Sequence, residues 1–221
     1  MLVTVKATQL HEAMERAPAS AIDNSAVIPF LNGFEHVEIL RRVYAQVVPA
    51  TIRIESTRIG PGVIRHTSPF AAVEIAGAPA AADRFRATGL DVQLTHDENQ
   101  MLWDKFAILA PIALLTTAAR ANVGVIRTQR REELLALIDE VALVAGAENA
   151  PIDRAAILRM VDAAHETMES SMQRDQAAGR PLELDALGGA LLRTAARARI
   201  DTPVTRRLVE EIEARTASTS A

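Results

Sequence analysis

The hydrophobic pattern of the chain changes near residue 98, and this change limits the folds that the chain can adopt. Before it, short runs of β-branched residues alternate with glycine, proline and short amphipathic segments, a pattern typical of mixed α/β structure. After it, apolar residues recur at helical spacing over long stretches such as 132–145. The sequence therefore predicts an α/β domain over residues 1–97, an all-α domain over 98–216 and a disordered tail over 217–221.

Proline and glycine mark the expected helix ends. Pro151 and Pro203 suit the first turn of a helix, and Thr202 is a good N-cap for the second of them. The most apolar run, FAILAPIALL at 106–115, is too short to span a membrane and contains Pro111. We therefore expect this run to form a buried core helix.

The composition excludes several functional classes. A formal net charge of −4 argues against nucleic-acid or anionic-membrane partners, which an acidic surface does not attract. There is no cysteine, and the 5 histidines are scattered, so neither a thiolate site nor metal catalysis is expected. The N-terminal sequence MLVTVKATQ lacks the features of a signal peptide, and a cytoplasmic location is compatible with this composition.

The segment 170–189 concentrates reactive side chains in a region otherwise rich in alanine and leucine. Ser171 and Asp175 are four residues apart and would share one helix face, and Gly179 is typical of a helix end. Pro181 would open the next helix, which places Glu183 in its first turn. From spacing alone, a helix–turn–helix with solvated charges is an equally good interpretation.

Six segments in order resemble the ketopantoate reductase (2-dehydropantoate 2-reductase) family. They are VTVKATQ at 3–9, FLNG at 30–33, GPGVIRH at 60–66, LWDKF at 102–106, the segment 170–189 with its S-S-M-x-x-D and E-L-D, and Thr202-Pro203. The resemblance implies a Rossmann-like domain followed by a helical domain like that of 6-phosphogluconate dehydrogenase. It also implies an NADPH-dependent oxidoreductase of pantothenate biosynthesis, whose substrate is a small 2-keto acid and whose helical domain can contribute to a homodimer.

The resemblance implies a catalytic pair, Lys105 and Glu183. Hydride addition leaves negative charge on the carbonyl oxygen, so the site needs a proton donor. In the family this donor is the lysine of W-x-K, here Lys105. Trp103 and Phe106 surround it with apolar bulk, and burial lowers a lysine pKa toward a useful range. Without the family, a lysine extending from a core helix to solvent is the simpler interpretation.

Binding residues follow from the same motifs. Ser171 matches the hydroxyl that binds the substrate carboxylate, and Asn32 matches the loop asparagine near nicotinamide and substrate. Gly33 and Lys6 match positions beside the cofactor. Alternatively, Asn32-Gly33 is a simple turn and Lys6 an exposed charge at a strand end. For Asp175 and Arg180 we favour a structural pair that holds the segment together.

Two features depart from the family. Ketopantoate reductases have asparagines four and eight positions after the lysine, whereas this chain has Leu109 and Ala113. Loss of such hydrogen-bonding groups can change substrate discrimination by orders of magnitude, which suggests a less polar substrate than ketopantoate.

The second departure is that the sequence contains no G-x-G-x-x-G loop for a dinucleotide pyrophosphate. The family has this loop roughly seventy residues before Val-Lys-Ala, so this chain begins at the fourth strand of the expected sheet. We therefore expect a truncated chain with impaired NADPH binding and an exposed edge at LVTV, residues 2–5. A non-catalytic helical dimerisation or binding module is the alternative.

Overall fold

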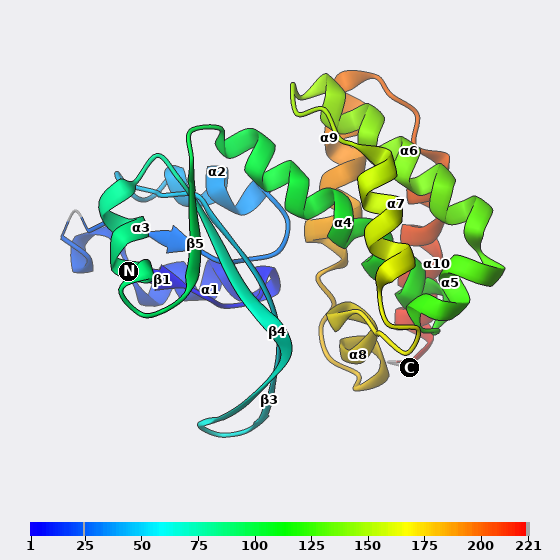
Figure 1. Ribbon diagram of the computed structural model, residues 1–221, viewed down its shortest axis with the longest axis horizontal. Coiled ribbons are helices and arrows are strands. Elements are labelled where there is room, and N and C mark those ends of the chain that lie inside the picture. The colour runs from blue at the N-terminus through cyan, green and yellow to red at the C-terminus, as the bar shows by residue number, and fades with distance from the viewer. Residues whose placement is uncertain (24, 220–221) are drawn as a thin grey trace.

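The computed structural model describes residues 1–23 and 25–219. An α/β part and a helical part lie side by side, and the long helix α4 (Glu98–Ala119) runs from one into the other (Figure 1). Asp97 caps this helix, because its side chain accepts a hydrogen bond from the Gln100 N–H. The change of hydrophobic pattern near residue 98 therefore coincides with the start of α4.

The α/β part contains short strands, short helices and one long hairpin. In chain order its elements are β1 (Leu2–Val3), η1 (Ala7–Gln9), α1 (Leu10–Arg16), η2 (Ala19–Ala21), β2 (Ile28–Pro29), α2 (Glu35–Arg41), β3 (Ala50–Gly60), β4 (Val63–Ala76), α3 (Pro79–Arg86) and β5 (Asp91–Thr95). Within the described residues, β1 pairs with β2 in parallel, β3 with β4 antiparallel, and β4 with β5 in parallel.

The hairpin β3–β4 is longer than the sequence pattern suggests. In the sequence, the runs 51–55, 63–66 and 72–75 look like three short extended segments, but the pairing continues from Ala50↔Ile75 to Gly60↔Val63. Pro61 and Gly62 form only the tight turn, so both flanking runs stay paired. The tip of the hairpin projects away from the rest of the molecule (Figure 1).

The expected edge at residues 2–5 is shorter in the structure. Only Leu2 and Val3 are in a strand, and β2 is their partner. Val3 is buried, whereas Leu2 is 54% exposed. This N-terminal strand therefore has one paired side within the described residues.

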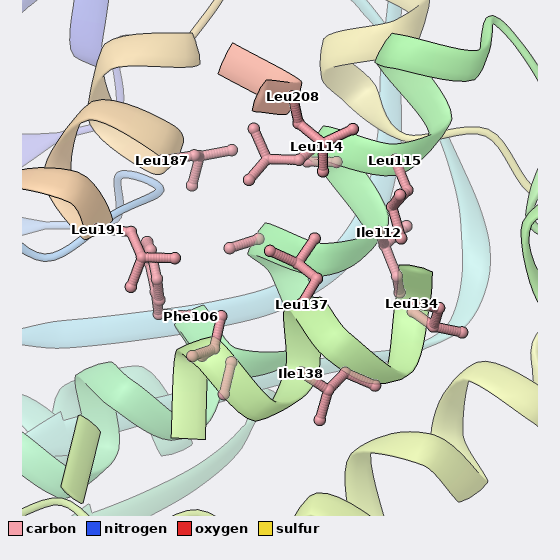
Figure 2. Close-up of a cluster of buried hydrophobic side chains, with 14 of the residues drawn as sticks. Phe106, Ile112, Leu114, Leu115, Leu134, Leu137, Ile138, Leu187, Leu191 and Leu208 are labelled. Atoms are coloured by element: carbon pink, nitrogen blue, oxygen red, sulfur yellow. The ribbon is translucent and has the colours of Figure 1, made fainter. Parts of the chain in front are cut away.

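The helical part packs around α4. Its other elements are α5 (Val123–Gln129), α6 (Arg131–Ala147), α7 (Arg154–Ala163), α8 (Ser171–Ala177), the π-helical segment η3 (Asp185–Gly189), α9 (Ala190–Ala198) and α10 (Pro203–Thr219). Figure 2 shows leucine, isoleucine and phenylalanine side chains of several helices meeting in one apolar cluster, among them Phe106, Leu114, Leu137, Leu187 and Leu208. Helix α4 is long and apolar enough to span a membrane, but 83% of its most apolar window is buried inside the protein, as expected for a core helix.

Two predicted helix boundaries are wrong. Helix α7 begins at Arg154 rather than near Pro151, because the Asp153 side chain caps it by accepting a hydrogen bond from the Ala156 N–H. Helix α10 begins at Pro203 as predicted but continues to Thr219, so residues 217–219 are helical rather than a disordered tail. No proline or glycine interrupts the helix before that point. Residues 220–221 of the predicted tail lie outside the described residues.

The two parts meet along α2 and α4. Arg193 of α9 pairs with Glu35 of α2 at 2.6 Å, and Arg41 of α2 pairs with Glu98 of α4 at 2.7 Å. These pairs are partly exposed and each contributes at most about 1 kcal/mol. Phe34, just before α2, packs on two rings of α4, with ring centroids 4.7 Å from Trp103 and 4.9 Å from Phe106. The junction thus has an aromatic centre and a charged rim.

Candidate active site

Lys105 lies on α4 where the two parts of the molecule meet. Its ammonium nitrogen Nζ donates a hydrogen bond to the backbone carbonyl of Leu31 at 3.2 Å. The neighbouring Trp103 and Phe106 are buried against Phe34, so an aromatic cluster holds this turn of α4 close to the 31–34 loop. The lysine is thereby oriented toward the loop that contains Asn32 and Gly33.

The surroundings of Lys105 change its proton affinity. Burial and, to a smaller extent, the charge of Arg53 lower the pKa of Lys105 from 10.5 to about 8, and the charge of Glu183 acts in the opposite direction. A lysine with this pKa is protonated at neutral pH but gives up its proton more readily than an exposed lysine. It therefore has the properties of a general acid.

The Asn32-Gly33 turn is held close to the helical part. Gly33 has a φ of +82°, and a Cβ at this position would lie 2.6 Å from the Ala186 carbonyl oxygen. Only glycine allows both this conformation and this close approach. Asn32 Nδ2 in turn donates a hydrogen bond to Glu183 Oε2 at 3.1 Å. The Asn32-Gly33 turn is therefore not an isolated turn, because it also contacts the helical part.

Glu183 is buried, with a relative exposure of 6%, and joins the two parts. Its Oε1 accepts a hydrogen bond from the Ala7 N–H at 3.0 Å, and its Oε2 accepts the one from Asn32. The prediction that Glu183 lies in the first turn of a helix is wrong by one position, because the helix starts at Leu184 and the Glu183 carbonyl accepts a hydrogen bond from the Leu187 N–H at 3.2 Å. Distant donors hold the carboxylate instead. The π-helical segment η3 follows directly, and such segments are frequent at functional sites.

Lys6 and Arg180 both bind Asp175, whose side chain is almost fully buried. Lys6 forms an ion pair with Asp175 Oδ2, and Arg180 Nε donates to Asp175 Oδ1 at 2.8 Å. Lys6 is therefore not a free charge at a strand end. Asp175 and Arg180 form the predicted structural pair, and the ion pair of Asp175 with Lys6 attaches α8 to the segment that follows β1.

The two neighbouring serines have different environments. Ser170 is the N-cap of α8, because its Oγ accepts a hydrogen bond from the Gln173 N–H at 3.0 Å and another from Thr116 Oγ1 at 2.8 Å. Ser171 is partly exposed, and its hydroxyl makes no hydrogen bond within the described part of the chain. Thr116 is eleven residues after Lys105, about 16 Å further along α4. The structure thus groups Lys105, Glu183 and Asn32, whereas the substrate-binding role of Ser171 stays a prediction.

Three polar residues of the α/β part, two of which interact electrostatically with Lys105, did not stand out in the sequence. The charge of Arg53 of β3 lowers the pKa of Lys105. Burial and the charge of Lys105 lower the pKa of His36 of α2 from 6.5 to about 4. The ring nitrogens of His36 and the hydroxyl of Thr51 are buried without a hydrogen-bond partner among the described residues. Only the two-residue spacing of Thr51 and Arg53 on a strand was visible in the sequence, and it does not indicate a partner.

The family models match both parts of the chain. The model described as "Ketopantoate reductase PanE/ApbA" matches residues 1–80, and the model "Ketopantoate reductase PanE/ApbA C terminal" matches residues 97–216, more than half of the chain. The chain belongs to the ketopantoate reductase family. The predicted family is therefore confirmed, and the chain is an oxidoreductase-family protein.

Curated relatives of this family member align with nearly all of the chain. A 2-dehydropantoate 2-reductase of Mycobacterium tuberculosis is 29% identical over 221 residues, which cover 95% of this chain and 73% of the relative. The uncharacterized oxidoreductase YkpB of Bacillus subtilis is 29% identical over 219 residues, covering 92% of this chain and 72% of its own length.

Solved structures agree on the fold. A PanE/ApbA family ketopantoate reductase from Ralstonia eutropha superposes with a TM-score of 0.91 at 24% identity, covering 100% of this chain and 76% of that one. A ternary complex of D-mandelate dehydrogenase with NADH and anilino(oxo)acetate superposes with a TM-score of 0.90 at 21% identity, covering 100% and 77%. The predicted combination of a Rossmann-like α/β part with a helical C-terminal part is confirmed.

Proposed function

We propose that this ketopantoate reductase family member reduces the carbonyl of a 2-keto acid with a reduced nicotinamide cofactor, and that Lys105 is the proton donor. The observation that supports this most directly is the partly buried Lys105, with its pKa lowered to about 8, at the junction where Glu183 and Asn32 meet. This combination matches the requirements of carbonyl reduction, which needs an acid near neutral pH and fixed hydrogen-bond donors.

The residues present fit the nicotinamide end of the cofactor. Asn32 uses its amide N–H groups toward Glu183, which leaves its carbonyl oxygen for another donor. Lys6 remains 40% exposed beside Asp175, and Gly33 lets the loop backbone lie close to a ligand. No glycine-rich pyrophosphate loop is present in the sequence, so we assign only the nicotinamide end to these residues. NADPH is the expected cofactor by family.

Residues of this chain would supply the proton that the carbonyl oxygen receives. A reduced nicotinamide supplies a hydride to the carbonyl carbon of the substrate. Lys105 donates a hydrogen bond to the carbonyl oxygen and then transfers its proton there, which yields a 2-hydroxy acid. The nearby carboxylate of Glu183 favours the protonated form of Lys105, which is the form that the reduction requires. Solvent returns the proton to the lysine after each turnover.

The substrate is expected to be less polar than ketopantoate. Leu109 lies one turn beyond Lys105 on the same face of α4, and Ala113 one turn further. Ala113 is buried in the helical cluster, whereas Leu109 is partly buried, so an apolar side chain of a keto acid would contact Leu109. Anilino(oxo)acetate, present in the D-mandelate dehydrogenase complex, has such a group next to an oxo-acid. A substrate with an aromatic or aliphatic side chain is therefore our preferred choice.

Turnover by the purified chain tests the proposal. NADPH or NADH oxidation would be followed with three keto acids: ketopantoate, the same acid without its hydroxyl, and phenylglyoxylate. We expect higher kcat/KM for the two less polar acids. No turnover of any 2-keto acid, with either cofactor raised above its measured dissociation constant, would refute the proposal and favour the non-catalytic dimerisation module.

Cofactor affinity and oligomeric state complete the test. Because no glycine-rich loop is present, we expect weak NADPH binding by titration, and tight binding would contradict the predicted impairment. A homodimer remains a prediction that light scattering can check. The expected cytoplasmic location likewise remains a prediction.

A further inference from the structure

One face of the hairpin β3–β4 is polar and is turned toward α4. Residues Thr51 and Arg53 alternate along β3, and Thr51 lies opposite Glu74 on β4, so all three share a face. The alternate residues Ile52 and Val73 point the other way and pack in the apolar cluster that includes Ala82 of α3.

Helix α4 covers the polar face. Ala76, which follows Glu74 by two residues on β4, packs with Met101 and Leu102 of α4. The next turn of α4 contains Asp104 and Lys105. The polar face of the hairpin and the proposed proton donor therefore lie on opposite sides of the same junction.

The polar groups on this face lack close partners. Arg53 has one ion pair within the described residues, with Glu74 at 3.7 Å, which is too long for a hydrogen bond. Its side chain is 35% exposed. Thr51 is 98% buried by contrast, with a relative exposure of 2%, and its hydroxyl has no partner among the described residues. Buried hydroxyl groups are normally hydrogen-bonded, so this one indicates a polar ligand beside Arg53.

The other cations at the junction are already engaged. Arg180 donates to Asp175 at 2.8 Å, Arg41 pairs with Glu98 at 2.7 Å, and Arg193 pairs with Glu35 at 2.6 Å. Lys6 also pairs with Asp175. Among these residues Arg53 has the longest ion pair, so its guanidinium is the one that can most readily change its partner for an incoming anion.

Electrostatic effects agree with this arrangement. The positive charge of Arg53 contributes to the lowered pKa of Lys105. Burial raises the pKa of Glu74, Arg53 lowers it, and Asp104 beside Lys105 raises it. The hairpin charges and the α4 charges are thus close enough to influence one another.

We propose that Arg53, with the Thr51 hydroxyl beside it, binds the carboxylate of the 2-keto acid whose carbonyl oxygen accepts a hydrogen bond from Lys105; this rests on the function proposed above. The carboxylate and the carbonyl occupy adjacent carbons, so the group that binds the first must lie close to Lys105. The planar guanidinium offers two parallel N–H donors to a carboxylate. Glu74 holds the guanidinium loosely until the substrate replaces it.

This role complements the one predicted for Ser171. Ser170, the neighbour of Ser171, caps α8 and is bonded to Thr116 of α4. A neutral serine hydroxyl provides neither charge nor a bidentate partner for a carboxylate. Arg53 provides both, and it is therefore the residue that selects acids over uncharged keto compounds.

The test compares a keto acid with its uncharged primary amide. Phenylglyoxylate and phenylglyoxylamide have the same side chain and carbonyl and differ in charge. Their dissociation constants would be measured calorimetrically, with and without oxidised cofactor, for the wild type and for Arg53→Met, Arg53→Lys and Glu74→Gln. Turnover with reduced cofactor, where present, separates kcat from KM.

We expect Arg53→Met to weaken binding of the acid about 100-fold and that of the amide less than threefold, because a desolvated charge pair is lost only with the acid. Arg53→Lys should bind the acid about tenfold more tightly than Arg53→Met, since lysine restores the charge without the planar guanidinium. Glu74→Gln should keep the preference for the acid. The effect should appear in KM, with kcat changed only a few fold.

Several outcomes would overturn the inference. If Arg53→Met weakens binding of the acid and of the amide equally, Arg53 and Glu74 form a purely structural cross-strand pair. The same conclusion follows if Glu74→Gln weakens acid binding as much as Arg53→Met does. A wild-type protein that binds the acid no more tightly than the amide would also refute it. Failure of the proposed function has a different signature, an absence of turnover, whereas the calorimetric acid-to-amide ratio tests Arg53 without turnover.

Discussion

The helical part and the α/β part of this protein are stabilised in different ways. In the helical part, α4, α6, α9 and α10 contribute to one continuous apolar cluster (Figure 2). In the α/β part the buried apolar residues fall into small separate clusters, one under α1, one under α3 and one beside α4. The first part contains its own core, whereas the second depends more on contacts with its neighbour.

This difference explains where the candidate site lies. The helical part provides the rigid support for Lys105 and Glu183, and the α/β part provides the Ala7 N–H, the Asn32 amide and the Leu31 carbonyl that hold them. Neither part alone contains all of these side chains and hydrogen-bonding groups. Four predictions test this division, from the largest expected effect to the smallest.

Removal of the lysine should separate activity from stability. We expect Lys105→Met to lower kcat/KM by about 10²–10⁴-fold, the typical contribution of a general acid. The free energy of unfolding at pH 7 should rise by about 1–3 kcal/mol, because a buried charge is removed and one pKa unit corresponds to about 1.4 kcal/mol. Steady-state kinetics and urea denaturation would measure both, with the exposed Arg159→Met as control. A variant with nearly full activity would contradict the role of Lys105.

Core truncations should distinguish the two parts directly. Leu137→Ala in the helical cluster should lower the free energy of unfolding by about 3–5 kcal/mol, because the surrounding helices cannot close the cavity. Leu10→Ala, equally buried in the cluster under α1, should cost about 2–3 kcal/mol, because partly exposed neighbours can move into the space. Urea denaturation of both variants would test this, and equal losses would show that the two parts are packed alike.

Acid pH should weaken the junction through His36. Its pKa is about 4 in the folded protein and about 6.5 when unfolded, so between these values the unfolded chain binds the proton first. The free energy of unfolding should therefore fall as the pH decreases from 6.5 to 4, by up to about 3 kcal/mol from this residue. His36→Asn should remove this part of the pH dependence, whereas the exposed His11→Asn should not. Parallel curves for all three proteins would contradict the prediction.

The smallest expected effect is the difference in the free energy of unfolding between two glycine-to-alanine variants. Gly33→Ala introduces both a positive φ and a Cβ 2.6 Å from the Ala186 carbonyl, so the loop must move away from η3. Gly77→Ala has a similar φ of +66° but open space around its Cβ. We expect a loss of about 1 kcal/mol for Gly77→Ala and about 1–2 kcal/mol more for Gly33→Ala. Thermal unfolding would measure this difference, and equal losses would show that the approach to Ala186 imposes no constraint.

Much of the helical part was predictable because its signals are local. Gly179 has a φ of +62° directly after α8, as expected for a residue that ends a helix, and Pro203 opens α10. The buried environment of α4 followed from its apolar composition. The motif residues Lys105, Asn32 and Glu183 were identified from the family resemblance, and the structure brings their side chains or neighbouring backbone together.

The partners of these residues were not predictable, and the error at Glu183 shows why. Its environment was predicted from the nearby Pro181, but its carboxylate binds the Ala7 N–H, 176 residues away. The same applies to the length of the β3–β4 hairpin, where cross-strand pairing continues through residues without a clear alternating pattern.

The sequence alone determined which segments become helices, where several of them end, and which side chains have the chemistry of a reductase, because helix propensity and capping act over a few neighbouring residues. Only the tertiary structure decided that Arg53 and His36 lie near Lys105, that Glu183 is held by donors from the other part, and that Lys105 has a pKa of about 8. These properties depend on burial and on charges brought together from distant positions, and such interactions exist only after the two parts have packed against each other.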